Sequence, residues 1–226
     1  MIILMVFLYS SLAYSTKILK PQVYLKYNKI RPVFSELYGI DKSNKEFNLE
    51  HIVPQSLFNK SSTIRCDMHN MILYPSKLNL HRSNYKFTSN PDIFPNSKIL
   101  SEEGFPLEYI SPINNENSIK TSKQRKFYPA DKYKGTIARS IMYFVSAYPK
   151  YERKIFEEII SPYTLLTWHH QFPVEEFEVV KNIVIEKTQK NNNIYVLSPE
   201  ELVKDMENII KEDLSIYKKF DYTKKN

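Results

Sequence analysis

The segment that most constrains this chain runs from residue 47 to residue 87, where two short apolar runs precede a stretch with helical spacing. The first run, residues 47–53, is rich in β-forming residues and is stopped by Pro54, which has no N–H to give to a sheet. The second run covers residues 70–74, and Pro75 after it suits the first turn of a helix. This order predicts a strand, a second strand and a helix.

Four polar residues of this segment stand at positions where they can meet. Glu50 and His51 lie on the first predicted strand, and Asn79 and Arg82, three residues apart, share one face of the predicted helix. Adjacent residues of a strand point to opposite faces, so Glu50 and His51 converge only if the chain turns sharply there. Pro54 and the irregular stretch after it favour such a bend.

The side chains are of the types that hydrolysis of a phosphodiester requires. An imidazole such as that of His51, with a reference pKa of about 6.5, is available as a neutral base near neutral pH. Glu50 and Asn79 offer a carboxylate and an amide oxygen, which are hard ligands of the kind that Mg²⁺ accepts. Arg82 offers a planar guanidinium that matches phosphate.

These residues belong to a longer pattern that resembles the endonuclease I family. The pattern begins with Glu50-His51-Ile52-Val53-Pro54, Asp67-Met68-His69-Asn70 and Asn79-x-x-Arg82-x-Asn84-x-x-Phe87. It continues with Lys134-Gly135-x-x-Ala138-Arg139, Trp168-His169-x-x-x-Pro173-Val174, Glu178, Asn182, Gln189 and Asn193. The resemblance spans roughly residues 25–197, which is most of the chain.

The resemblance implies an α+β fold, a single domain of mixed helices and strands built around a ββα-metal (His-Me finger) motif. It implies a metal-dependent endonuclease of low sequence specificity that hydrolyses DNA, with RNA left open, and leaves 5′-phosphate ends. His51 is then the general base, Glu50 and Asn79 are the metal ligands, and Arg82 is the fourth residue of the catalytic set. Mg²⁺ is the implied cofactor, with Mn²⁺ and Ca²⁺ as alternatives.

The chain departs from the family pattern at several positions. Asn48 and His81 stand where acidic residues are common in the family, and Phe172 precedes Pro173 where an aspartate is usual. Many members also carry a cysteine-rich insertion whose arginine contacts the scissile phosphate. Here the loop 55–65 is short, and Arg65 is the residue available to replace that arginine.

Charge and length are consistent with this hypothesis. The 226 residues suit one domain, and 32 Lys and Arg against 25 Asp and Glu give a net charge of +7, which favours a polyanionic partner such as nucleic acid. Two alternatives stay open. The first is a catalytically weak or inactive nucleic-acid-binding protein on the same scaffold, and the second is a basic secreted protein that binds an acidic protein or lipid head group.

The N-terminal residues 1–15 carry no charged side chain and end in small residues, as in a cleaved signal peptide. Their apolar run is shorter than the ~20 residues that span a bilayer. We therefore expect a secreted, monomeric protein without stable membrane association, whose nuclease domain covers residues 16–226. The single cysteine, Cys66, excludes an intrachain disulfide.

The remaining residues predict a mainly helical second half. Residues 88–127 are rich in Pro, Asn and Ser and are interpreted as a long surface excursion. Apolar spacing predicts helices over residues 136–148 and 175–190. A C-terminal helical extension is expected from about residue 198, where a serine and a proline precede two glutamates.

Overall fold

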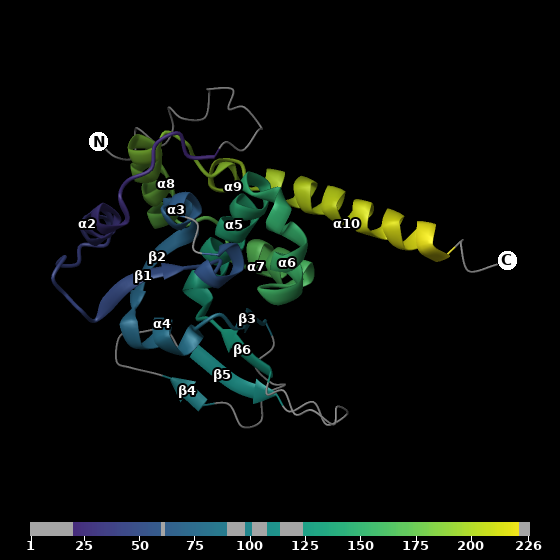
Figure 1. Cartoon of the computed structure of the whole chain (residues 1–226), viewed down its shortest axis with the longest axis horizontal. Helices are drawn as coiled ribbons and strands as arrows, with labels where there is room; N and C mark the ends of the chain where they lie inside the picture. The colour runs from purple at the N-terminus through teal and green to yellow at the C-terminus, as the bar shows by residue number, and fades with distance from the viewer. Residues whose placement is uncertain (1–19, 60–61, 90–97, 101–107, 114–123, 222–226) are drawn as a thin grey trace.

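The computed structural model describes residues 20–59, 62–89, 98–100, 108–113 and 124–221, and it has the mixed helix and strand content of an α+β fold (Figure 1). The helices are α2 (Tyr27–Leu37), α3 (Ser62–Arg65), α4 (Ser76–Arg82), α5 (Asp131–Ala147), α6 (Glu152–Glu158), α7 (Pro162–Gln171), α8 (Glu176–Gln189), α9 (Ile194–Leu197) and α10 (Glu200–Asp221). The short 3₁₀ helices are η2 (Gln55–Phe58), η3 (Met68–Asn70) and η4 (Pro149–Tyr151). The strands are β1 (Phe47–His51), β2 (Met71–Pro75), β3 (Lys86–Phe87), β4 (Lys98–Leu100), β5 (Glu108–Ile113) and β6 (Gln124–Tyr128).

The predicted strand, strand and helix of the central segment are confirmed as elements. Strands β1 and β2 pair antiparallel with Glu50 opposite Ile72 and His51 opposite Met71. Helix α4 follows β2 directly and contacts both strands, so its inward face lies against β1. The first strand ends at His51, two residues earlier than the sequence suggested.

Asn70, directly before β2, holds the residues that follow β1 through three hydrogen bonds. Its side-chain oxygen accepts a hydrogen bond from the Val53 N–H at 2.8 Å, and its amide nitrogen donates to the Val53 carbonyl at 3.0 Å. The Asn70 carbonyl accepts from the Ile52 N–H at 3.0 Å. These three bonds replace the strand ladder after His51 and bend the chain away from β2.

Within residues 88–127, which the composition suggested to be a long surface excursion, the described residues form strands of a sheet. The strand order is β3-β6-β5-β4, with β3 parallel to β6 and the other pairs antiparallel. Pro112 lies in β5, where a proline in a two-sided strand would lose a hydrogen bond. Among the described residues, β4 pairs with residues 108–110 and β6 pairs with β5 across Pro112.

Helix α5 is the centre of the larger hydrophobic core. It begins at Asp131, five residues before the predicted start, and Ile137, Ile141, Phe144 and Val145 are all buried as expected. Helix α8 matches the predicted helix 175–190 within one residue at each end, and α10 confirms the predicted C-terminal helix. A second, smaller core forms where α2 packs over β2.

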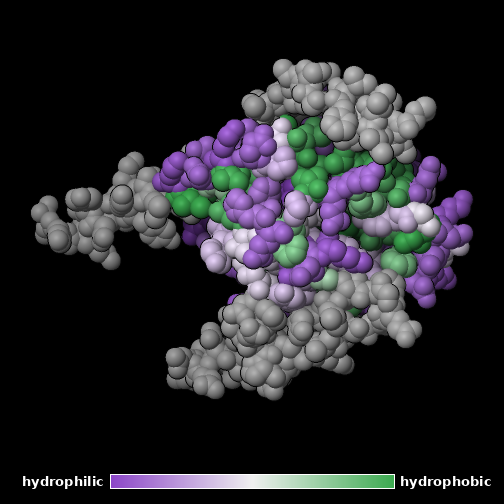
Figure 2. Space-filling model, turned by 180° about the vertical axis from the view of Figure 1, so that it is seen from behind, coloured by the Kyte–Doolittle hydropathy of each residue, from purple (hydrophilic) through white to green (hydrophobic). Residues whose placement is uncertain are grey.

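Figure 1 shows how these parts surround the hairpin. Helix α4 lies between the β1–β2 hairpin and the four-stranded sheet, while α2 covers the other side of the hairpin and α10 projects outward beyond α9. Seen from behind, the surface mixes hydrophilic side chains with separate apolar patches (Figure 2). No helix among the described residues is both long and apolar enough to cross a membrane. The expected signal peptide, residues 1–15, lies outside the described residues.

Candidate active site

Glu50 and Arg82 meet in a buried ion pair that joins β1 to the last residue of α4. The Arg82 Nη1 atom donates to Glu50 Oε1 at 2.8 Å and to the His51 carbonyl at 3.0 Å, and Nη2 donates to the Ile52 carbonyl at 2.5 Å. The Arg82 guanidinium also lies 4.8 Å from the centre of the Phe87 ring. Arg82 is 1% exposed. The guanidinium therefore ties the end of β1 to α4.

The environment of Glu50 disfavours its charged form. Burial raises the pKa of Glu50 to about 7, although the adjacent Arg82 acts in the opposite direction. Ile72, Phe127 and Ile137 are among the apolar side chains that line the small cavity beside this carboxylate. Any additional positive charge beside Glu50 would therefore stabilise the ionised form of its carboxylate.

Asn79 lies on the face of α4 that contacts β1. Its amide nitrogen donates to Asn48 Oδ1 at 2.5 Å and to the Leu49 carbonyl at 3.3 Å. Both protons of the Asn79 amide are directed to β1, so the amide oxygen points away from these two acceptors. Acidic residues are common in the family pattern at position 48. Here the side-chain amide of Asn48 provides the oxygen that accepts the hydrogen bond from Asn79.

The His51 imidazole is held on the other side of β1. Its Nε2 atom lies 2.9 Å from the Arg65 carbonyl and its Nδ1 atom lies 3.1 Å from the Gln55 amide nitrogen. The Tyr27 ring stacks on the imidazole at 5.9 Å with an interplanar angle of 12°. Burial lowers the pKa of His51, and the charges of Arg65 and Arg82 act in the same direction. The neutral imidazole is therefore favoured.

Arg65 completes a stack of three side chains. Its guanidinium lies 3.8 Å from the centre of the Tyr27 ring, whose plane is almost parallel to the His51 imidazole. The buried Arg65 Nε atom has no hydrogen-bond partner, and no described acidic side chain forms an ion pair with this arginine. A half-buried cation without a carboxylate partner is suited to binding an anion.

The structure thus distributes the four predicted residues over two neighbouring environments. Glu50 and Arg82 are in direct contact, and Asn79 binds the backbone one residue before Glu50. The side chain of His51 contacts a different set of neighbours, as the alternation of a strand requires. The sharp turn follows His51 and does not separate it from Glu50, so the bend does not bring the two side chains together. Asn84 is exposed beyond the end of α4.

Two neighbours of His51 could not be found from the sequence pattern. Tyr27 comes from α2, 24 residues before His51, and nothing in the local sequence links them. Gln55 carries a weak local signal, because Pro54 starts a short 3₁₀ turn that brings the chain back toward the end of β1. Tertiary packing decides the Tyr27 contact, and the local turn after Pro54 brings Gln55 to His51.

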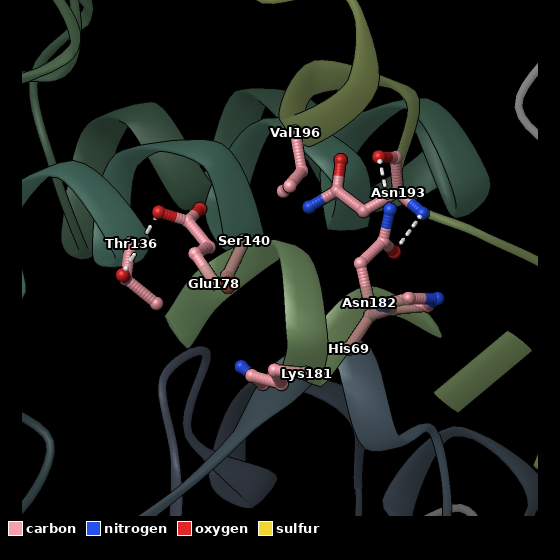
Figure 3. A pocket seen from close by; sticks show the side chains of 8 residues that line it. All are labelled: His69, Thr136, Ser140, Glu178, Lys181, Asn182, Asn193 and Val196. Carbon is pink, nitrogen blue, oxygen red and sulfur yellow. Dashed lines mark hydrogen bonds between the residues drawn. The ribbon is translucent and has the colours of Figure 1, made fainter. Parts of the chain in front are cut away.

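The downstream residues of the family pattern form a buried polar network that supports the fold. Arg139 on α5 is bound by both carboxylate oxygens of Glu178 on α8 at 2.7 Å. Figure 3 shows Glu178 turned toward Thr136, and Asn182 bonded to the backbone of Asn193. Burial lowers the pKa of Lys181, beside them, to about 8.

The structure explains why two further positions of the family pattern are occupied by Gly135 and Asp67. A Cβ atom at Gly135 would clash with the Phe172 carbonyl and the Arg139 guanidinium, so a glycine is required there. The buried carboxylate of Asp67 accepts four hydrogen bonds, from the His69 N–H, the Tyr143 and Tyr148 hydroxyls and the Gln189 amide. Gly135 thus lets α5 approach the end of α7, and Asp67 ties η3 to α5 and α8.

The candidate metal ligands among the described residues are oxygen donors. No three described His, Cys, Asp or Glu side chains are grouped as a metal site. The candidate donors are instead the Glu50 carboxylate and the Asn79 amide, a combination of one acid and one amide.

Comparison with known protein families gives one match over most of the chain. The family model described as Endonuclease I matches residues 8–200. This range includes the hairpin, α4, the Arg65 stack and the whole polar network of α5 and α8. The resemblance inferred from the motifs is confirmed. The chain therefore belongs to the endonuclease I family, a family of nucleases.

Proposed function

We propose that this protein is a metal-dependent endonuclease of low sequence specificity that hydrolyses phosphodiester bonds in DNA, with RNA as a second substrate class, and leaves 5′-phosphate ends. The observation that carries the proposal is the way His51 is held. The Arg65 carbonyl can only accept a hydrogen bond, so it requires a proton on Nε2 and leaves the lone pair on Nδ1. A neutral imidazole with one oriented lone pair is a general base.

The residues present fit a hard divalent cation. Asn79 has its nitrogen committed to Asn48 and Leu49, which leaves its oxygen as the free donor atom. Glu50 supplies a carboxylate that a positive charge would stabilise in its ionised form. We propose that Glu50 and Asn79 hold Mg²⁺, or Mn²⁺ or Ca²⁺ in its place. When bound, such a cation polarises the phosphate and stabilises the departing 3′ oxygen.

The two arginines take different roles in this proposal. Arg82 has both terminal nitrogens bonded to protein oxygens and is almost fully buried, so it positions Glu50 and does not reach a phosphate. Arg65 is half-buried, its guanidinium lies against the Tyr27 ring, and it forms no ion pair with an acidic side chain among the described residues. We therefore propose Arg65, which the sequence already offered in place of the insertion arginine of the family, as the phosphate-binding residue instead of Arg82.

A plasmid-nicking assay with and without a chelator tests the proposed function. Purified protein is expected to convert supercoiled plasmid to nicked and linear forms in Mg²⁺, and EDTA is expected to abolish the conversion. Binding of DNA without nicking in Mg²⁺, Mn²⁺ or Ca²⁺ would favour the inactive nucleic-acid-binding protein. Neither nicking nor salt-dependent DNA binding would favour the secreted interaction protein.

Metal binding is expected to depend on pH. Because the pKa of Glu50 is raised to about 7 in the folded protein, protons compete with a cation at this carboxylate below that pH. The apparent Mn²⁺ affinity measured by calorimetry should be roughly tenfold weaker at pH 6 than at pH 8. The Glu50→Gln variant should bind weakly at both values. An equal affinity of the wild type at pH 6 and pH 8 would contradict this assignment.

Loss of the Arg65 guanidinium is expected to weaken cleavage. Arg65→Met should lower kcat/KM for DNA by roughly 10- to 100-fold, the effect expected for a lost hydrogen bond to a charged group. Arg153→Met is the matched control, because it removes the same charge from an arginine that is 90% exposed on α6. Arg65→Lys should recover little, since lysine lacks the planar fork. Equal losses in Arg65→Met and Arg153→Met would indicate a nonspecific charge effect.

We also propose that the protein is secreted as a monomer after removal of residues 1–15. A low-specificity nuclease endangers the genome of the cell that makes it, and export avoids this. N-terminal sequencing of the protein from the culture medium is expected to begin at Thr16. Full-length protein confined to the cells would argue against export.

A further inference from the structure

The tautomer of His51 is set by two contacts that agree with each other. The Arg65 carbonyl, 2.9 Å from Nε2, requires a proton on that nitrogen. The Gln55 atom 3.1 Å from Nδ1 is an amide nitrogen, which donates only and therefore requires a lone pair on Nδ1. The lone pair that would accept a proton during catalysis is thus already bonded to Gln55.

The position of Gln55 allows its side chain to move away from Nδ1 of His51. Gln55 is the first residue of η2, and it is half-buried, whereas His51 is buried and Ser56 is exposed. Its backbone carbonyl is fixed by the Asn59 N–H, so the turn stays in place when the side chain moves. Rotation of the side chain about its own bonds therefore opens Nδ1 without unfolding the turn.

The donor of Gln55 also has the correct character for holding a water molecule. A water placed between Gln55 and His51 can donate one hydrogen to Nδ1 while it accepts a hydrogen bond from the amide. One lone pair of the water then remains for attack. The aromatic rings of Tyr27 and Phe58 lie near the imidazole ring, with centroid distances of 5.9 Å and 6.4 Å, while Gln55 is the side chain that contacts Nδ1.

We propose that Gln55 is a positioning residue that caps Nδ1 of His51 before substrate binds and then holds the attacking water against this atom. The inference rests on the proposed function. In the step, an O–H bond of the water breaks, the proton passes to Nδ1 and the oxygen forms a bond to phosphorus. The P–O bond to the 3′ oxygen breaks, and this oxygen keeps the electron pair and takes a proton from solvent. The imidazolium returns its proton to solvent.

Two readouts test this role, one of them without substrate. Gln55→Met keeps the length of the side chain and removes the donor, Gln55→Ala removes both, and Ser56→Ala is the control on the adjacent exposed residue. Nitrogen-15 spectra of His51 in the free protein should show a protonated Nε2 and a lone pair on Nδ1. The Nδ1 signal should shift in both Gln55 variants and stay unchanged in Ser56→Ala.

Kinetics on plasmid DNA supply the second readout. Both Gln55 variants should lose about tenfold in kcat with little change in KM, because the lost bond acts on the water and not on DNA binding. A kcat of Gln55→Met within twofold of the wild type would overturn the inference while leaving the proposed function intact. A wild-type protein that shows the Nδ1 contact in its spectrum but does not cleave DNA in any of the three cations would overturn both.

Discussion

Replacing His51 with alanine is expected to lower the rate of plasmid nicking by roughly 10²- to 10⁴-fold, which is the usual contribution of a general base. The contacts with the Arg65 carbonyl and the Gln55 amide fix the tautomer of the His51 imidazole, and alanine removes this base. DNA binding should persist, because the cation at Arg65 and the net charge of +7 are unchanged. The measurement is single-turnover nicking beside a binding titration at fixed salt.

The control for this variant is a second histidine. His170→Ala changes an exposed histidine at the end of α7, and it should cleave at the wild-type rate. Thermal unfolding of both variants would show whether the loss of the Tyr27 stack affects the fold of His51→Ala. A His51→Ala protein that nicks plasmid as fast as the wild type would remove His51 from the mechanism.

Replacing Arg82 with methionine is expected to destabilise the protein by about 3–5 kcal/mol, the usual cost of leaving one partner of a buried ion pair alone. The substitution leaves the Glu50 carboxylate buried and removes the donors of the His51 and Ile52 carbonyls. Urea unfolding at pH 8, where Glu50 is mostly ionised in the wild-type protein, measures the loss.

A double variant separates the structural role of the pair from its functional role. In Arg82→Met/Glu50→Gln no charge remains buried, so part of the lost stability should return. Metal-dependent nicking should stay absent, because the carboxylate is missing. The exposed pair Arg153–Glu157 gives the control, and Arg153→Met should cost no more than about 1 kcal/mol. A fully stable Arg82→Met protein would show that the pair does not join β1 to α4 as described.

Local sequence predicted the elements that carry the candidate site. The apolar runs before Pro54 and Pro75 became β1 and β2, and the helical spacing after Pro75 became α4. Helices α5 and α8 followed from apolar residues that recur with a helical period, and α10 followed from the serine, proline and glutamates at its start. These predictions hold because burial of one face and the missing N–H of proline act within a few residues.

The same reasoning could not reach contacts between residues that are distant in the sequence. Strands β4, β5 and β6 are stabilised by each other, and the Pro- and Asn-rich composition of the whole segment 88–127 gave no sign of this pairing. Arg82 was assigned to phosphate because a guanidinium fork suits phosphate. Its burial against Glu50 depends on how α4 packs on β1, which no local pattern contains.

The sequence by itself determined the family, the hairpin and helix, and the identity of the acid, imidazole and amide side chains. The tertiary structure decided which of them meet. It paired Glu50 with Arg82, turned the Asn79 nitrogen to β1 and enclosed His51 between Tyr27, Arg65 and Gln55. The physical reason is that side-chain type and backbone period are local properties, whereas burial, ion pairing and a fixed tautomer arise only when separate segments pack together.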